Sequence, residues 1–122
     1  MIKLIFCLHR LPTLTPDAFR TYWRTHHAAL VKDRATVLRI ARYVQSHGAE
    51  HPFDAAMQAS REAQPPYDGF AELWWHSEDD LTAAMTDPAA LKAGAELLED
   101  ERTFIDLRRS SLTFVREHMV VG

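Results

Sequence analysis

Two adjacent histidines, His26 and His27, lie within a stretch rich in aromatic residues and are the most suggestive chemical groups of the chain. An imidazole changes its charge near neutral pH, so either histidine could act as a general acid or base. The apolar residues around them recur at intervals of three and four, the spacing of one helix face: Phe19, Tyr22, Trp23, Leu30 and Val31. At about 100° per residue, His26 falls near the centre of this face and His27 on its flank. The alternative interpretation is a histidine that is hydrogen-bonded in a structural position.

The residues that precede the histidines are typical of a helix N-terminus. Thr15 is a good N-cap, and Pro16 occupies the first helical position, where a missing N–H costs nothing. Asp17 places negative charge in the first turn, which the helix dipole favours. The pattern therefore predicts a helix over 15–33 that buries one face against a sheet or another helix.

A second group of polar side chains falls on a predicted strand over 37–47. Tyr43, Gln45 and His47 share one face of this strand, because they are spaced by two residues. If that face lines a pocket, a hydroxyl, an amide and an imidazole could together orient a carbonyl or a phenol. In the alternative interpretation, Tyr43 packs within the sheet and its polar neighbours lie at the rim.

Aromatic residues of a third predicted strand, DGFAELWWH, could form the wall of a small-molecule site. Phe70 and Trp74 share one face of this strand and could line a site together with Trp23, although such residues are more often core. Glu72 lies between these two aromatics and is either a carboxyl of raised pKa or a polar contact at a dimer interface. His118, near the C-terminus, could reach the same cavity or lie at that interface.

Neither a metal nor a bound cofactor is predicted. The chain has seven histidines but no H-E-x-x-H motif, and no carboxylate falls at a recognisable ligand spacing. His47 and His51 are four residues apart, but Gly48 and Pro52 disfavour a helical pair of ligands. Nothing marks an axial haem ligand. With four glycines in all, the chain has no glycine-rich phosphate loop, and it has no serine-centred elbow motif.

Composition narrows the class of protein. The 122 residues fit one domain, residues 1–122, and 47% of them are hydrophobic, enough for a packed core. A net charge of −3 provides no basic footprint for nucleic acid. No stretch approaches the ~18 apolar residues of a membrane span, and the apolar start is too short for a signal peptide. We therefore expect a cytoplasmic protein without a membrane partner. The lone cysteine, Cys7, excludes an intrachain disulfide.

The order of the predicted elements specifies the fold class. The elements are a strand over 2–9, the helix over 15–33, a strand over 37–47, a long connection over 49–66, a strand over 68–76, helices from 77 and from 88, and a last strand within 107–121. This is the βαββαβ arrangement of an α+β, ferredoxin-like fold with an antiparallel sheet. In the helix from 88 the predicted apolar face consists of Leu91, Ala95 and Leu98.

The first strand is apolar on both faces, which indicates a partner subunit. Leu4, Phe6 and Leu8 face one way, whereas Ile5 and Cys7 face the other. One layer of helices covers only one face of the sheet. Packing the second face against the same face of another copy, in a two-fold homodimer, is the economical way to bury it.

The long connection over 49–66 could form a helical turn or two within 53–63. Loops of this length are usually lids, binding loops or disordered segments. A mobile surface loop is favoured here over a lid, because no residue of the segment has a chemical role that we can name.

The chain resembles the EthD-domain family of the dimeric α/β barrel superfamily. The segment YWRTHHAALV (22–31) is similar to the family's YW-x-x-x-H-x-x-L pattern, RYVQSH (42–47) to its second strand, and YDGFAELWWHSEDDL (67–81) to its third strand and the following helix entry. The opening IKLIFCLHR and the segment LLEDERTFIDL (97–107) also fit. The likeness spans nearly the whole chain except 49–66, and it rests on the order and spacing of the motifs. Where the family often has Gly-Pro after the histidine, this chain has Ala28 and Ala29.

The resemblance implies a homodimer of two face-to-face sheets, with a pocket between sheet and helices in each subunit. By the YW-x-x-x-H pattern, His27 matches the family's histidine and His26 occupies a position that is usually apolar. The pattern and the helical wheel therefore disagree on which histidine matters. The resemblance favours His27, because flank residues would line a pocket at the edge of the helix–sheet contact.

The expected function is that of a small homodimeric enzyme acting on an apolar, oxygen-bearing molecule, aromatic or polyketide-like. His27 would move a proton, Tyr43 with His47 would hold the oxygen, and Trp23, Phe70 and Trp74 would shape the pocket. Dehydratase, cyclase, isomerase and cofactor-free monooxygenase activities all need such a step, and the sequence does not choose among them. The alternatives are a non-catalytic binding or accessory protein for a degradative oxygenase system, and a purely structural dimer module.

Overall fold

The computed structural model describes all of residues 1–122. A four-stranded antiparallel sheet is the centre of the fold. β1 (Ile2–Leu8) pairs with β3 (Gly69–Trp75) on one side and with β4 (Ser111–Val115) on the other. β2 (Arg42–His47) extends the sheet at the other edge of β3. The strand order β2-β3-β1-β4 and the βαββαβ connectivity are those of the ferredoxin-like fold, which confirms the predicted α+β class.

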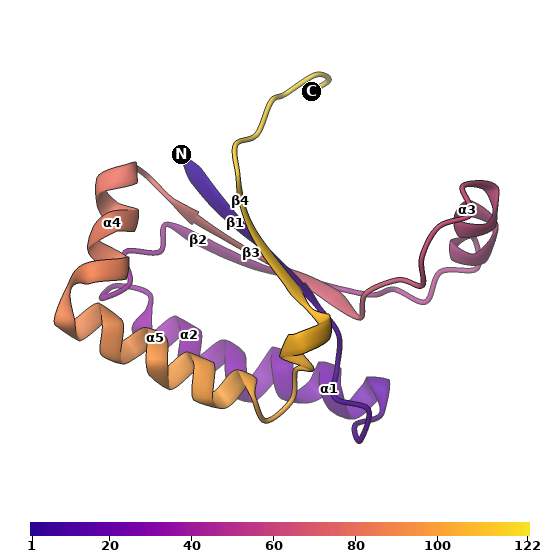
Figure 1. The fold of residues 1–122 in the computed structure, drawn as a ribbon, viewed down its shortest axis with the longest axis horizontal. Coiled ribbons are helices and arrows are strands. Elements are labelled where there is room, and N and C mark those ends of the chain that lie inside the picture. The colour runs from indigo at the N-terminus through magenta and orange to yellow at the C-terminus, as the bar shows by residue number, and fades with distance from the viewer.

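Helices cover one face of this sheet (Figure 1). The first is a long helix composed of α1 (Pro16–Tyr22), a π-helical turn η1 (Trp23–His27) and α2 (Ala28–Arg34). The second connection consists of α4 (Glu78–Thr86) and α5 (Pro88–Glu101), and a short turn η2 (Leu107–Arg109) leads into β4. α2 and α5 lie side by side on the covered face. None of these helices combines the length and the apolar character that a membrane crossing requires.

The three predicted helix starts are confirmed, and two of them carry a side-chain cap. The Thr15 hydroxyl accepts a hydrogen bond from the Ala18 N–H at 3.1 Å, directly before Pro16. The Ser77 hydroxyl accepts one from the Asp80 N–H at 3.0 Å. Such caps satisfy N–H groups that have no partner within the helix.

The π-helical turn decides which histidine is buried. In η1 the Ala28 N–H bonds to the Trp23 carbonyl, five residues earlier. An α-helix rotates by about 40° beyond a full turn over four residues, and the wider π turn offsets part of that rotation. The buried residues are therefore spaced by four throughout: Phe19, Trp23, His27 and Val31. His26 is exposed. The wheel that placed His26 at the centre of the buried face was wrong, because it assumed one uniform period.

The second strand begins at Arg42, five residues later than predicted. Residues 36–39 instead continue from α2 as turns, in which the Leu38 N–H bonds to the Arg34 carbonyl at 3.0 Å. Arg39 has a φ of +53°, a left-handed conformation that ends the turn. The indole of Trp75 donates to the Leu38 carbonyl at 2.8 Å and ties the turn to the end of β3.

The buried face of α5 also differs from the prediction. Ala90, Ala93 and Leu97 are buried, whereas Leu91, Ala95 and Leu98 are exposed. The buried alanines form one cluster with Val31 and Leu38. The helix thus packs through its small residues, because these let α5 approach α2 closely, and it leaves larger apolar residues outside.

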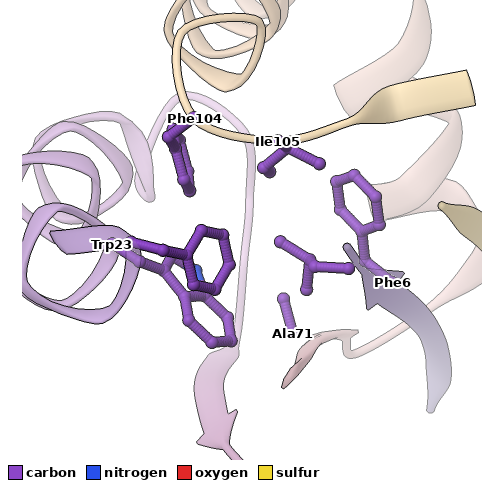
Figure 2. Close-up of a cluster of buried hydrophobic side chains, with 7 residues drawn as sticks. Phe6, Trp23, Ala71, Phe104 and Ile105 are labelled. Carbon is purple, nitrogen blue, oxygen red and sulfur yellow. The ribbon is translucent and has the colours of Figure 1, made fainter. Parts of the chain in front are cut away.

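The main hydrophobic core lies on the helix-covered side of the sheet (Figure 2). Phe6 of β1 and Ala71 of β3 meet Trp23 from the long helix, with Phe104 and Ile105 from the segment after α5. Trp23 is fully buried and lies over the start of β3. That position is a glycine, Gly69, where a Cβ atom would come within 2.5 Å of the indole ring. The close contact of helix and sheet therefore depends on the absence of a side chain at this point.

The opposite side of the sheet carries no helix (Figure 1). Strand alternation places Phe70, Glu72 and Trp74 there, next to Lys3 of β1. The Lys3 ammonium lies 3.4 Å from a Glu72 carboxylate oxygen and 4.6 Å from the centre of the Trp74 ring. The Trp74 indole donates to Glu117 at 2.9 Å. This open face therefore combines apolar side chains with ion pairs and is less apolar than predicted.

The connection over 49–66 forms α3 (Asp54–Ser60), within the range predicted to contain helical turns. Figure 1 shows this helix standing away from the sheet. Its larger apolar residues, Phe53 and Met57, are exposed. The segment does not cover the helix–sheet core.

Candidate active site

A small cavity of about 100 Å³ lies between the sheet, the long helix and α5. Its lining is apolar or aromatic apart from two ionisable side chains, His27 of η1 and Glu101 at the end of α5. Tyr43 of β2 adds a phenolic hydroxyl. Three groups able to exchange protons thus meet in surroundings that are otherwise apolar, which is the usual character of a small-molecule site.

His27 is held in one orientation by Asp100 of α5. The Nδ1 atom of His27 lies 2.7 Å from a carboxylate oxygen of Asp100, and both side chains are largely buried. The other carboxylate oxygen of Asp100 accepts a hydrogen bond from the Tyr22 hydroxyl at 2.5 Å. A carboxylate at Nδ1 selects the tautomer that carries its proton there. The second ring nitrogen, Nε2, makes no hydrogen bond within the chain and keeps its lone pair for a ligand in the cavity.

Burial and the Asp100 carboxylate act on His27 in opposite directions. Burial lowers the pKa of His27 because it disfavours the charged imidazolium, and the bond and charge of Asp100 raise it. Burial is the larger effect, so the pKa lies below the ordinary value. The imidazole is therefore neutral at pH 7 and is available as a base.

Glu101 is a carboxyl group in an apolar environment. Burial, and then the neighbouring Asp100 charge, raise its pKa from 4.5 to about 7, while Arg102 opposes the rise. A substantial fraction of Glu101 is therefore protonated at neutral pH and can donate a proton or a hydrogen bond. The cavity combines a neutral base with a neutral acid, the pairing that general acid–base chemistry needs.

The sequence analysis assigned no role to Asp100 or Glu101, which lie within the segment 97–107 that fits the family. Two signals mark them. Glu101 follows Ala93 and Leu97 at intervals of four, so it continues the buried face of α5. Three consecutive acidic residues (99–101) also lie at the C-terminus of the helix, where its dipole disfavours negative charge. Such a run indicates that nearby groups stabilise these carboxylates or that one of them is protonated.

Tyr43 belongs to a chain of hydrogen bonds on the covered face of β2. The Gln45 amide nitrogen donates to the Tyr43 hydroxyl at 3.0 Å and to the Trp23 carbonyl at 2.9 Å. The Gln45 amide oxygen lies 2.9 Å from Nε2 of His47. Burial raises the pKa of Tyr43, and its hydrogen bonds oppose the rise. Burial, then Arg24 and Arg20, lower the pKa of His47, whose ring lies 4.2 Å from that of Trp23.

The predicted site residues separate into three groups: residues at the cavity, residues on the open face of the sheet, and exposed histidines. His27, Tyr43 and Trp23 line the cavity, and His47 supports it from behind Gln45. Phe70, Glu72 and Trp74 lie on the open face of the sheet and do not line it. His26 is exposed, although its Nε2 lies 3.5 Å from Asp100. His118 is exposed in the segment after β4. No group of three or more histidine, cysteine or carboxylate side chains is arranged to hold a metal ion.

Comparison with known families and structures gives a consistent result. The family model described as the EthD domain matches residues 11–108. The structure of an ethyl tert-butyl ether D (EthD) family protein from Bacillus halodurans matches with a TM-score of 0.63 at 18% identity, covering 97% of this chain and 99% of that chain. No protein of curated function matches the sequence.

Two further solved structures share the fold. A dimeric ferredoxin-like protein of unknown function from Thermobifida fusca matches with a TM-score of 0.59 at 14% identity, covering 95% of this chain and 90% of that chain. SnoaB, a cofactor-independent oxygenase from Streptomyces nogalater, matches with a TM-score of 0.55 at 12% identity, covering 98% of this chain and 95% of that one.

Proposed function

Because the chain belongs to the EthD-domain family, we propose that it is a small homodimeric enzyme that transfers protons on an apolar, carbonyl-bearing molecule held in the helix–sheet cavity. The observation that carries this proposal is the buried His27–Asp100 pair beside Glu101. The cavity contains no lysine or arginine to bind an anion. Its lining therefore favours a neutral substrate that is largely hydrocarbon.

The proposed step forms an enol. Nε2 of His27 takes a proton from the carbon beside the carbonyl, and the electron pair of that C–H bond becomes the new C=C bond. The carbonyl π electrons move to oxygen, which accepts hydrogen bonds from the Tyr43 hydroxyl and the protonated Glu101. A proton from Glu101 completes the enol. Asp100 stabilises the imidazolium that forms, and the proton on His27 can return to the same or another carbon.

Two observations bear on the reaction class and the assembly. SnoaB is described as a cofactor-independent oxygenase, which is one of the reaction classes considered for this chain. The Thermobifida fusca relative is described as dimeric. A two-fold partner on the open face of the sheet would bury the exposed part of Phe70 and its neighbours.

The test is the exchange of cyclopentanone α-protons for deuterium in D₂O, followed by NMR. This probe is a small, neutral and largely hydrocarbon ketone, which suits an apolar cavity of about 100 Å³. We expect the chain to accelerate exchange, and we expect His27→Ala to lower that acceleration by about 10²–10⁴-fold. His26→Ala is the matched control, since the adjacent imidazole is exposed, and it should retain at least half of the acceleration.

Equal exchange by the wild type and His27→Ala would contradict a catalytic role for His27. Cyclopentanone that raises the melting temperature without exchanging its protons would instead favour the non-catalytic binder. The apolar lining of the cavity supports that second function, because binding needs only the cavity and not the acid–base pair.

A further inference from the structure

The side chain of Gln45 is hydrogen-bonded to Tyr43, to His47 and to the main-chain carbonyl of Trp23. The carbonyl of Trp23 fixes the direction of all three bonds. A carbonyl oxygen accepts hydrogen bonds and never donates them. Because it lies 2.9 Å from the side-chain nitrogen of Gln45, the orientation of that amide is settled. The NH₂ group faces the helix, and the amide oxygen faces His47.

The donor and acceptor roles of the other members follow from this orientation. The second N–H of Gln45 points at the Tyr43 oxygen, 3.0 Å away, so the phenol accepts. The Gln45 oxygen accepts, so Nε2 of His47, at 2.9 Å, carries a proton. The hydroxyl proton of Tyr43 then has no acceptor within the protein, and the Tyr43 side chain lines the cavity.

The π-helical turn η1 positions the main-chain carbonyl of Trp23. In η1 the Trp23 carbonyl also accepts the N–H of Ala28. The wider turn lets Trp23 and His27 face the cavity side together, while this carbonyl reaches the neighbouring strand. One distortion of the helix therefore positions the base directly and the phenol through Gln45.

We infer that Gln45 is a positioning residue, which ties the Trp23 carbonyl to Tyr43, is itself oriented by His47, and thereby directs the Tyr43 hydroxyl proton at the substrate oxygen. This inference rests on the proposed function for its catalytic meaning. It explains why the substrate must present a hydrogen-bond acceptor, such as a carbonyl oxygen, to Tyr43.

The ionisation of Tyr43 tests this inference without any substrate. Absorbance titration of the three tyrosines, with Tyr43→Phe subtracted, isolates the Tyr43 signal. Gln45→Leu removes the Gln45 donor to the phenolate at similar side-chain volume and leaves the Trp23 side chain in place, so the midpoint should rise by about one pH unit. Gln58→Leu is the matched control on the outlying α3 and should leave the midpoint unchanged. An unshifted midpoint in Gln45→Leu would overturn the inference.

A second variant keeps the test decisive if Gln45→Leu does not fold. His47→Phe retains an aromatic ring against Trp23 but removes the donor to Gln45. We expect the midpoint of Tyr43 to rise about half as much as in Gln45→Leu. No rise would count against the His47–Gln45–Tyr43 series of hydrogen bonds, called the relay below. In the exchange assay both variants should lower kcat more than they raise KM. If His27→Ala abolishes exchange while neither relay variant alters kcat or the Tyr43 midpoint, the relay is wrong and the proposed function stands.

Discussion

The two faces of the sheet carry similar residue types but place them in different environments. On the covered face Trp23 packs over β3, and Glu101 meets the cavity without an ionic partner. On the open face Trp74 lies beside a lysine ammonium, and Glu72 is paired with Lys3 at 3.4 Å. The pKa of a carboxyl is raised where burial leaves its charge uncompensated, as at Glu101, and lowered where partners stabilise the charge, as the Trp74 indole and then Lys3 do for Glu117. The comparison teaches that the surroundings of a tryptophan or glutamate, more than its presence, decide its chemistry.

The largest expected difference between the two faces is in the free energy of unfolding lost when Trp23 or Trp74 is replaced by alanine. Trp23→Ala leaves a large void in the core and should lower the free energy of unfolding by about 3–5 kcal/mol. Trp74 is also buried (7% exposed), but charged side chains and not core residues surround it, so Trp74→Ala should cost less, about 2–3 kcal/mol. Urea denaturation of both variants measures the difference. Equal costs would mean that the open face is packed as tightly as the core, as a bound second copy would make it.

Removing the charge of Asp100 should disable the covered face chemically while leaving its shape. Asp100→Asn can no longer select the His27 tautomer that exposes a lone pair to the cavity, so cyclopentanone exchange should fall by about 10²–10³-fold. Glu99→Gln, a neutralisation at the adjacent exposed position, is the control and should exchange at the wild-type rate. Retention of full activity by Asp100→Asn would show that the pair is structural.

The raised pKa of Glu101 predicts a distinctive dependence of stability on pH. Its pKa is about 7 in the folded chain against an ordinary 4.5, so the folded state binds more protons between these values. The stabilisation of the folded state by protonated Glu101 is fully present below pH 4.5 and is lost as the pH rises through 7. Glu101→Gln lacks this pH-dependent loss. The free energy of unfolding of the variant minus that of the wild type should therefore be higher at pH 8 than at pH 5, by about 2–3 kcal/mol at most. Urea denaturation of wild type and variant at both pH values measures this, and a pH-independent difference would refute the shift.

Glu72→Gln on the open face should have the smallest effect. The Lys3–Glu72 pair is partly exposed, and Glu117 remains 3.8 Å from the lysine, so the loss should not exceed about 1 kcal/mol. The same glutamate-to-glutamine change thus tests both faces. If Glu72→Gln altered cyclopentanone exchange as much as Glu101→Gln, the assignment of the site to the covered face would be wrong.

The parts of the site that could be predicted are those with a local signature. Thr15 and Ser77 are followed by their helices because capping acts within one turn, and His27 stands in a motif of the family. Asp100 is 73 residues from His27, and no local pattern relates them. Phe70 and Trp74 were assigned to the pocket because alternation identifies residues that share a face but not which face the helices cover.

The family follows from the resemblance of several motifs. The order of the elements, the fold class and the residue types able to move a proton could be predicted without the structure. These follow from periodicity, capping and spacing, which act over a few residues at a time. Three features emerge from the folded chain alone: His27 and not His26 is buried, Asp100 and Glu101 complete the site, and Gln45 links Tyr43 to the helix. These outcomes depend on a π-helical turn and on contacts between distant segments, where packing overrides the local period.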